Sequence, residues 1–303
     1  MCRRSIVISV SLLSIVAAAR AAESRPAQAA TERHVYVTVM DRQGAPVPGL
    51  TTADFRLREG GQDREVVAVE AASDRMRMAI LVEESLTPTG GVRIGLGEFI
   101  QRMQPHAEMS LVVVGLRNVV VVDYTTDIGA LFAAINAWSP VAYQQQVNNV
   151  PEGIYEAARA FQRERPERPV MVVIAREMMQ QSSQEPQHVL DHIGRSGARV
   201  EVVTVEFGQM AGPVGSLSDM SGRAQVLGDG SRQSGGRRIE VSALTAVSRA
   251  LHQIADGLLS QYRLTWVRPV GGRASERINV NLLRSGLTLR APMRIARDAV
   301  PGG

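Results

Sequence analysis

Between residues 76 and 257 the chain alternates strand-length apolar runs with segments whose apolar positions recur at helical spacing. The runs 78–82, 170–175 and 200–207 are nearly continuous in apolar or β-branched residues, which is typical of parallel strands buried on both faces. We therefore expect an α/β fold with a doubly wound, mostly parallel sheet and helices on both faces. The other expected strands are 110–115 and 119–124, and the expected helices are 92–104, 127–137, 151–164, 187–196 and 240–259.

Two local patterns refine this picture. The second and third strands are separated by a short turn at Asn118, which predicts one antiparallel hairpin at an edge of the sheet. Residues 223–227 are predicted to form a short strand. The glycine-rich stretch 228–236 is predicted to be a flexible loop, because its single carboxylate, Asp229, is too little for a calcium cage.

The segments on either side of this region have strand-like alternation. Residues 35–39 alternate valine with polar residues, and residues 55–59 and 64–69 predict a hairpin around Gly60 and Gly61. After Leu259, strands are expected at 262–267, 277–283 and 287–291, with residues 284–286 turning the last two into a hairpin. We expect the two groups to form one small antiparallel β unit. The expected divisions are a signal peptide 1–22, a linker 23–33, an N-terminal β unit 34–74, an α/β domain 75–259, a C-terminal β segment 260–296 and a tail 297–303.

The first residues have the order of a secretory signal. Arg3 and Arg4 precede an apolar run at 6–19, and Ala19-Arg20-Ala21 supplies a small-x-small cleavage site. The apolar run is shorter than the roughly 20 residues that span a bilayer, so cleavage is favoured over a retained anchor, which stays the alternative. The sequence therefore predicts a secreted or periplasmic protein with no membrane span in its mature chain.

Charge and cysteine content exclude several classes of function. Cleavage would remove three arginines and lower the formal net charge from +4 to +1. The remaining basic residues, all arginine, are scattered among carboxylates, so we expect no nucleic-acid partner. The only cysteine, Cys2, lies in the signal, which excludes a disulfide or a catalytic thiol from the mature chain.

One histidine pair has the spacing of a metal site. His188 and His192 stand four residues apart on an expected helix beside Asp191, a spacing that can share a zinc ion. No catalytic glutamate and no third ligand accompany them, so a solvated helix face is the preferred interpretation. We expect no catalytic residues, and the chain is not expected to be an enzyme.

The strongest candidate site follows the strand 78–82. Glu83, Glu84, Ser85 and Thr87 come directly after this apolar run. In open α/β sheets ligands bind at the carboxyl ends of the strands. A carboxylate followed by alternately spaced hydroxyls offers a hard cation several oxygen ligands from one loop.

Both ends of the chain carry motifs of one family. The opening motif is the segment 37–50 (Val-Thr-Val-Met-Asp-Arg-Gln-Gly-Ala-Pro-Val-Pro-Gly-Leu), followed by Ala-Asp-Phe at 53–55 and Glu-Gly-Gly at 59–61. The closing motif is Gln-Tyr-Arg-Leu-Thr-Trp at 261–266, followed by Arg-Ile-Asn-Val at 277–280. Together these motifs resemble bacterial secreted von Willebrand factor A (VWFA)-related proteins of the acidobacterial type, over about residues 35–295.

The resemblance implies a von Willebrand A-like domain that binds protein partners through a divalent cation at the top of the sheet. The family's first loop has the pattern Asp-x-Ser-x-Ser, here Glu83, Ser85 and Thr87, with Glu84 beside them. Glu152 stands near the position of the family's threonine, and Arg176 stands where its aspartate belongs. A guanidinium cannot ligate a cation and would repel one by several kcal/mol at an effective dielectric near 20.

We therefore expect a degenerate, metal-free adhesion site in which Arg176 pairs with Glu83, Glu84 or Glu152. Two alternatives stay open, namely a divalent cation such as Mg²⁺, and an Arg176 that points to solvent while the top face has no role. The expected function is a secreted or periplasmic, adhesion-like protein–protein interaction module without a cofactor and with an unknown protein partner. The alternative is a structural or assembly component of the cell envelope in which the A domain is a scaffold.

Overall fold

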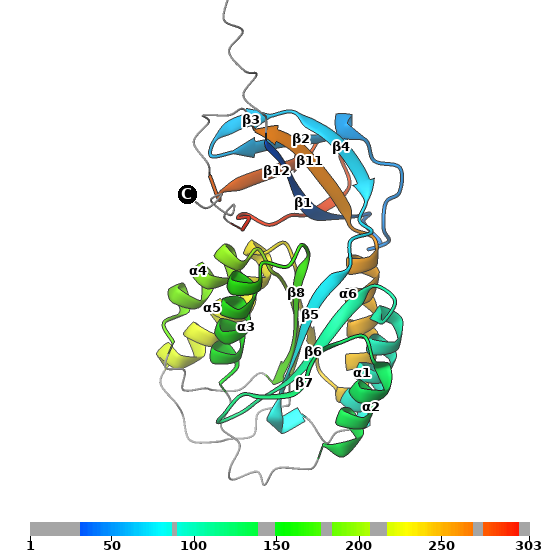
Figure 1. The fold of residues 1–303 in the computed structure, drawn as a ribbon, viewed down its shortest axis with the longest axis vertical. Coiled ribbons are helices and arrows are strands. Elements are labelled where there is room, and N and C mark those ends of the chain that lie inside the picture. Colours follow the sequence, from blue (N-terminus) through cyan, green and yellow to red (C-terminus); the bar gives the residue numbers. More distant parts are fainter. Residues whose placement is uncertain are drawn as a thin grey trace, which may run out of the picture.

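The chain forms a small β sandwich stacked on a larger α/β unit (Figure 1). This computed structural model describes residues 31–86, 90–138, 149–176, 184–206, 217–268 and 275–296, without the side chains of residues 217–221. The predicted signal 1–22 and tail 297–303 lie outside these ranges. Across the described ranges, no helix combines the length and apolar character needed to cross a membrane.

A six-stranded sheet forms the centre of the α/β unit, in the order β10-β9-β8-β5-β6-β7. All neighbouring strands are parallel except β6 and β7, which are antiparallel. The predicted parallel sheet and its antiparallel edge hairpin are therefore confirmed. The strands are β5 (Met76–Glu83), β6 (Ala107–Val114), β7 (Val119–Thr125), β8 (Pro169–Arg176), β9 (Arg199–Val205) and β10 (Arg238–Val241).

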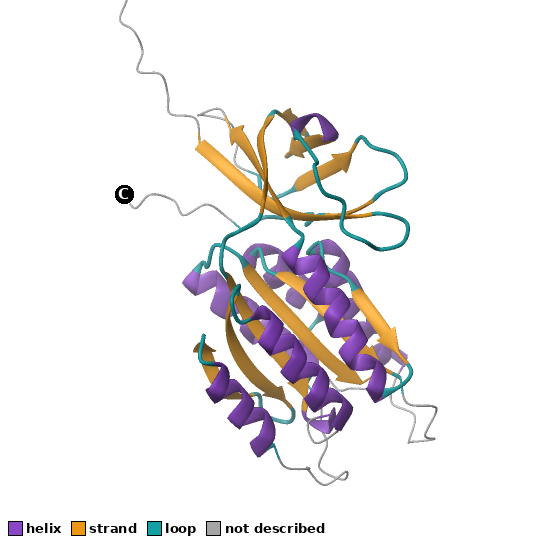
Figure 2. Ribbon diagram, turned by 90° about the vertical axis from the view of Figure 1, so that its right-hand side faces the viewer, coloured by secondary structure: helices purple, strands orange, loops and turns teal. Residues whose placement is uncertain are grey.

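Helices cover both faces of this sheet (Figure 2). On β5, Met78 and Ile80 pack with α1 (Gly90–Met103), α2 (Ile128–Ala137) and α6 (Val247–Leu259). Ala79 and Leu81 point to the other face, toward α3 (Val150–Glu164), α4 (Pro186–Ser196) and α5 (Leu217–Gln233). Because successive side chains of a strand alternate between faces, an apolar run is what a doubly covered strand requires.

The stretch between β9 and α6 differs from the prediction. Residues 223–233, predicted as a strand and a loop, belong to α5, and residues 238–241 at the expected start of a helix form the parallel strand β10. The buried positions of α5 recur at helical spacing but include small residues; they are Arg223, Val226, Leu227, Gly230 and Ser231. A Cβ on Gly230 would lie 3.0 Å from Ile193 Cδ1 of α4, so close packing favours glycine where the sequence suggested a loop.

Strands from both ends of the chain build the β sandwich. Its two sheets have the orders β13-β1-β11-β4 and β12-β2-β3, so the expected pairing of the N- and C-terminal segments is confirmed. Val37, Leu57 and Trp266 are completely buried between the sheets. The strands are β1 (Thr31–Met40), β2 (Phe55–Glu59), β3 (Gln62–Arg64), β4 (Val66–Ala71), β11 (Tyr262–Arg268), β12 (Ile278–Leu282) and β13 (Thr288–Arg290). Short 3-10 helices in the described part of the chain are η1 (Thr52–Asp54), η2 (Glu84–Leu86) and η4 (Leu244–Ala246).

Two expectations for these segments were wrong. The turn at 284–286 does not make a hairpin, because β12 pairs with β2 and β13 pairs with β1 in the other sheet. β1 begins at Thr31, so the last three residues of the expected linker 23–33 belong to a strand that pairs with β11. In both cases the strand pairs with a segment far away along the chain, and the local composition of a turn or linker does not indicate that pairing.

Candidate functional site

The last residue of β5, Glu83, is the centre of the candidate site. Its side chain is completely buried. Its Oε1 accepts a hydrogen bond from Ser85 Oγ at 2.8 Å, and its Oε2 accepts one from the main-chain N–H of Arg176 at 2.7 Å. The carboxylate therefore joins the ends of the neighbouring parallel strands β5 and β8.

A buried arginine completes the shell of this carboxylate. Arg223 of α5 is 3% exposed, and its Nη2 donates to Glu83 Oε2 at 3.0 Å and to the carbonyl oxygen of Arg176. Its Nε and Nη1 are also buried and find no acceptor among the described residues. The result is a buried ion pair that ties α5 to the carboxyl edge of the sheet.

Among the described residues, the guanidinium that pairs with Glu83 belongs to Arg223 of α5. Arg176 contacts Glu83 through its main-chain N–H. Sequence reasoning missed Arg223 because residues 223–227 were taken as a short strand. The helical spacing of the buried positions after it is the signal that could have placed it on an inward-facing helix.

The remaining predicted residues lie at the same edge or outside the described ranges. Glu84 is half-buried against Gly115, where a Cβ would lie 3.0 Å from Glu84 Cδ. Glu152 lies in the first turn of α3, and the following residue, Gly153, packs against the last residue of β6 and against β5. Thr87 lies outside the described residues.

The groups around Glu83 do not fit a divalent cation. Both carboxylate oxygens accept hydrogen bonds, and the Arg223 guanidinium, which can only donate, lies 3.0 Å from Oε2. A cation bound there would face the repulsion of Arg223 at short range. No group of three or more histidine, cysteine, aspartate or glutamate side chains suited to a metal occurs in the part of the chain that the structure describes.

The histidine pair of α4 forms a ring cluster with α3. The rings of His188 and His192 lie 4.8 Å apart, and both contact the ring of Tyr155. Gln162 Nε2 lies 3.0 Å from His192 Nδ1, and Asp191 is paired with Arg294 at 2.9 Å. The face is thus partly packed against α3 and not simply solvated.

We predict that His192 titrates below its ordinary pKa of 6.5. Burial lowers this pKa, and the neighbouring His188 lowers it further. The unfolded chain therefore takes up the proton first as the pH falls, so the stability from neutral His192 is present above the ordinary pKa and is lost as the pH drops through the folded value. NMR titration of the ring protons measures this pKa. A midpoint at or above 6.5 would contradict the assignment.

Comparisons with known proteins give distant likenesses. No protein-family model matches the chain, and no curated protein matches it. Among solved structures, it is similar to an aerotolerance-related membrane protein from Bacteroides fragilis, with 15% identity, a TM-score of 0.43 and coverage of 60% of this chain and 98% of the other. It is also similar to the vWF domain of the type V pili tip protein Mfa5 from Porphyromonas gingivalis, with 9% identity, a TM-score of 0.46 and coverage of 62% and 96%.

A third likeness is to proximal thread matrix protein 1 from the mussel byssus, with 12% identity, a TM-score of 0.44 and coverage of 66% of this chain and 49% of the other. TM-scores at this level carry no argument about function.

Proposed function

We propose that this chain is a secreted or periplasmic, non-enzymatic protein-interaction module of von Willebrand A type, and that it binds its partner without a cation. The observation that carries the proposal is the buried ion pair between Glu83 and Arg223. An internal guanidinium supplies the positive charge beside Glu83 and cross-links α5, β5 and β8. The carboxyl edge of the sheet is then a preformed face that needs no cofactor.

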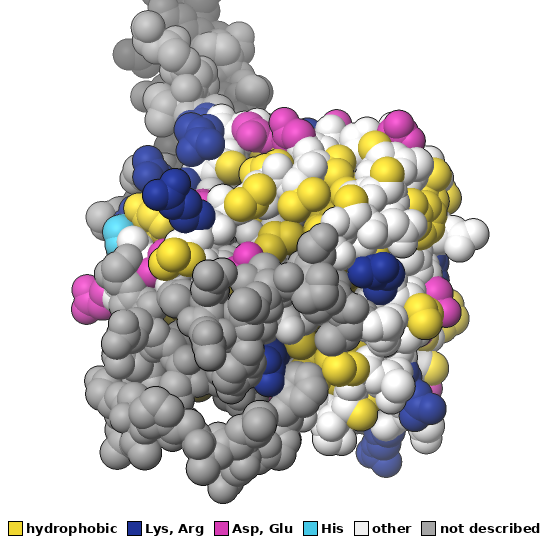
Figure 3. Space-filling view, turned by 90° about the horizontal axis from the view of Figure 1, so that it is seen from below, with side chains coloured by type: hydrophobic (Ala, Val, Ile, Leu, Met, Phe, Trp, Pro, Cys, Tyr) yellow, Lys and Arg dark blue, Asp and Glu magenta, His cyan; other side chains and the backbone are white. Residues whose placement is uncertain are grey.

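An exposed apolar surface beside this edge supports binding of a protein. We name it the β7 patch; its residues and their exposed fractions are Leu116 64%, Val119 53%, Val120 59% and Val121 37%. The patch lies on the hairpin between β6 and β7, and β7 is the edge strand of the sheet. Contiguous exposed apolar side chains are a mark of interaction surfaces, and an edge strand leaves main-chain donors and acceptors for a partner. Figure 3 shows this end of the molecule, with hydrophobic side chains gathered beside the region that is not described.

The second candidate is a cell-envelope assembly component that makes its contacts through the β sandwich. One observation favours it: Val67 of the sandwich edge strand β4 is 44% exposed. Val120 and Val67 are the same residue type on two different edge strands. They therefore form a matched pair of positions at which the two candidates can be distinguished.

The test compares Val120→Glu with Val67→Glu. Each tagged protein is incubated with an envelope extract of the source cells in the presence of EDTA, and captured proteins are identified by quantitative mass spectrometry. The proposal expects a partner that is retained in EDTA, retained by Val67→Glu and lost with Val120→Glu. Loss with Val67→Glu alone supports the assembly component, and capture that EDTA abolishes contradicts cation-free binding.

A further inference from the structure

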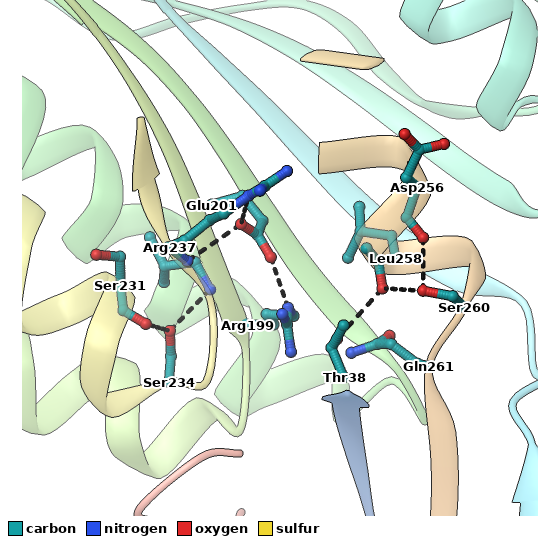
Figure 4. A network of polar contacts seen from close by, with 12 residues as sticks. Thr38, Arg199, Glu201, Ser231, Ser234, Arg237, Asp256, Leu258, Ser260 and Gln261 are labelled. Carbon is teal, nitrogen blue, oxygen red and sulfur yellow. Dashed lines mark hydrogen bonds and ion pairs between the residues drawn. The ribbon is translucent and has the colours of Figure 1, made fainter. Parts of the chain in front are cut away.

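A second polar site lies at the opposite end of the central sheet, where the β sandwich meets the α/β unit. A cavity of about 260 Å³ is lined there by residues of both units. Exposed residues such as Glu32 and Arg165 surround it, and its buried lining includes Arg168, Arg199 and Gln261. Figure 4 shows the polar network at this junction.

Arg199, the first residue of β9, has two donor atoms without an acceptor. It is 6% exposed, and its Nε donates to Glu201 Oε1 at 2.6 Å. Its Nη1 and Nη2 are buried and have no hydrogen-bond partner among the described residues. The negative charge of Glu201 is shared between Arg199 and Arg237. Its Oε2 accepts a hydrogen bond from the main-chain N–H of Arg237 at 3.1 Å and lies 4.0 Å from the Arg237 guanidinium.

Gln261 contributes a third unpaired donor to the same cavity. Its Oε1 accepts from Arg168 Nε at 3.2 Å and from Arg168 Nη2 at 2.7 Å. Since a guanidinium only donates, these two bonds determine which end of the amide is oxygen. Gln261 Nε2 is therefore a donor, and it is buried without a partner in the described ranges.

Two buried arginines of the cavity lining, Arg168 and Arg199, lie close enough for their charges to repel each other. Arg168 is held by neutral acceptors, including the carbonyl oxygens of Leu258 at 2.6 Å and Asp74 at 3.0 Å. Burial lowers the pKa of Arg168 to about 10, and repulsion from Arg199 adds to this effect. A buried donor without a partner is unfavourable, so a ligand that accepts a hydrogen bond from it gains affinity.

We propose that this cavity binds a small oxyanion, a phosphate or a carboxylate, between the Nη1 and Nη2 atoms of Arg199 and the Nε2 atom of Gln261. The paired N–H groups of a guanidinium match two oxygens of such a group. The volume lies below the roughly 300–1,000 Å³ of sites for drug-sized ligands, which limits the ligand to a small one. Because both units line the cavity, binding there stabilises their contact.

Calorimetric titration and thermal unfolding of the protein with sodium phosphate or sodium succinate test this proposal. Sodium chloride at matched ionic strength is the control for screening. We expect saturable binding of at least one of the two anions and a rise of the melting temperature with its concentration. Comparison of phosphate with succinate distinguishes a phosphate site from a carboxylate site.

Three variants make the test specific. Arg199→Met should weaken binding by about tenfold or more, because it removes a charge-assisted pair of hydrogen bonds. Arg199→Lys keeps the positive charge beside Glu201 but loses the paired N–H groups, so it should bind the anion more weakly than the wild type. This variant keeps the test valid if Arg199→Met does not fold. Arg56→Met removes an exposed arginine of β2 far along the sandwich and should bind as the wild type does. Absence of saturable binding of both anions to the wild type at about 10 mM, or unchanged affinity in both Arg199 variants, would overturn the proposal.

Discussion

Replacing Arg223 with methionine should lower the free energy of unfolding by about 3 kcal/mol. The substitution leaves the buried Glu83 carboxylate with the Ser85 hydroxyl and the Arg176 main chain as its hydrogen-bond partners among the described residues. Removal of one partner from a buried ion pair typically costs about 3–5 kcal/mol. The lower end applies here because Arg223 itself buries two nitrogens without acceptors among the described residues, and their removal is favourable. Equilibrium unfolding in urea measures the change.

Two further variants show whether the loss belongs to the ion pair. Arg176→Met retains the main-chain groups that contact Glu83 and should cost less than about 1 kcal/mol. The double variant Glu83→Gln, Arg223→Met removes both charges and should recover much of the stability lost by the single one. An Arg223→Met protein within about 0.5 kcal/mol of the wild type would show that the pair does not stabilise the carboxyl edge.

Trp266→Ala should destabilise the protein by about 3–5 kcal/mol, the usual cost of removing a large aromatic side chain from a core. Trp266 is completely buried in the β sandwich, on the strand β11 that pairs with both β1 and β4. The loss therefore falls on the contact between N- and C-terminal segments. Urea unfolding followed by circular dichroism measures the change in the free energy of unfolding, because the signal includes the β-sheets of the sandwich and of the α/β unit.

Trp138→Ala is the matched control for this prediction. Trp138 follows α2, is only partly buried and packs at the margin of the helical core. Its replacement should cost clearly less than that of Trp266, since less apolar area is removed from contact. Equal losses of unfolding free energy in Trp266→Ala and Trp138→Ala would show that burial of Trp266 in the sandwich does not add the expected stability.

The elements that the sequence predicted well are those with large apolar side chains in a strong pattern. The run 78–82 and its counterparts became buried parallel strands, and the valines at 35, 37 and 39 became the inner face of a sandwich strand. In these segments local pattern and tertiary environment agree, because a doubly covered strand must be apolar on both faces.

The failures occur where small residues or distant partners decide. In α5 the packed stripe contains Gly230 and Ser231, which suggest a loop when only composition is considered. The same error concealed the role of Arg223, because residues 223–227 were expected to form a short strand and not a helix that packs against the end of β5. Glu83 itself was selected from its place after an apolar strand, and this signal is local. Its partner Arg223 is 140 residues away along the chain, and no local sequence pattern identifies a partner so distant.

Thermal unfolding of the wild-type protein shows whether Arg223 takes the place of a cation beside Glu83. The melting temperature is measured in EDTA and again with magnesium, manganese or calcium at about 10 mM. A cation that binds the native state must raise stability by RT ln(1 + [L]/Kd), so an occupied site would be visible at concentrations well above its Kd. Because Arg223 already supplies the positive charge, the melting temperatures in all four conditions should be equal. A saturable rise with magnesium or manganese that EDTA reverses would contradict it.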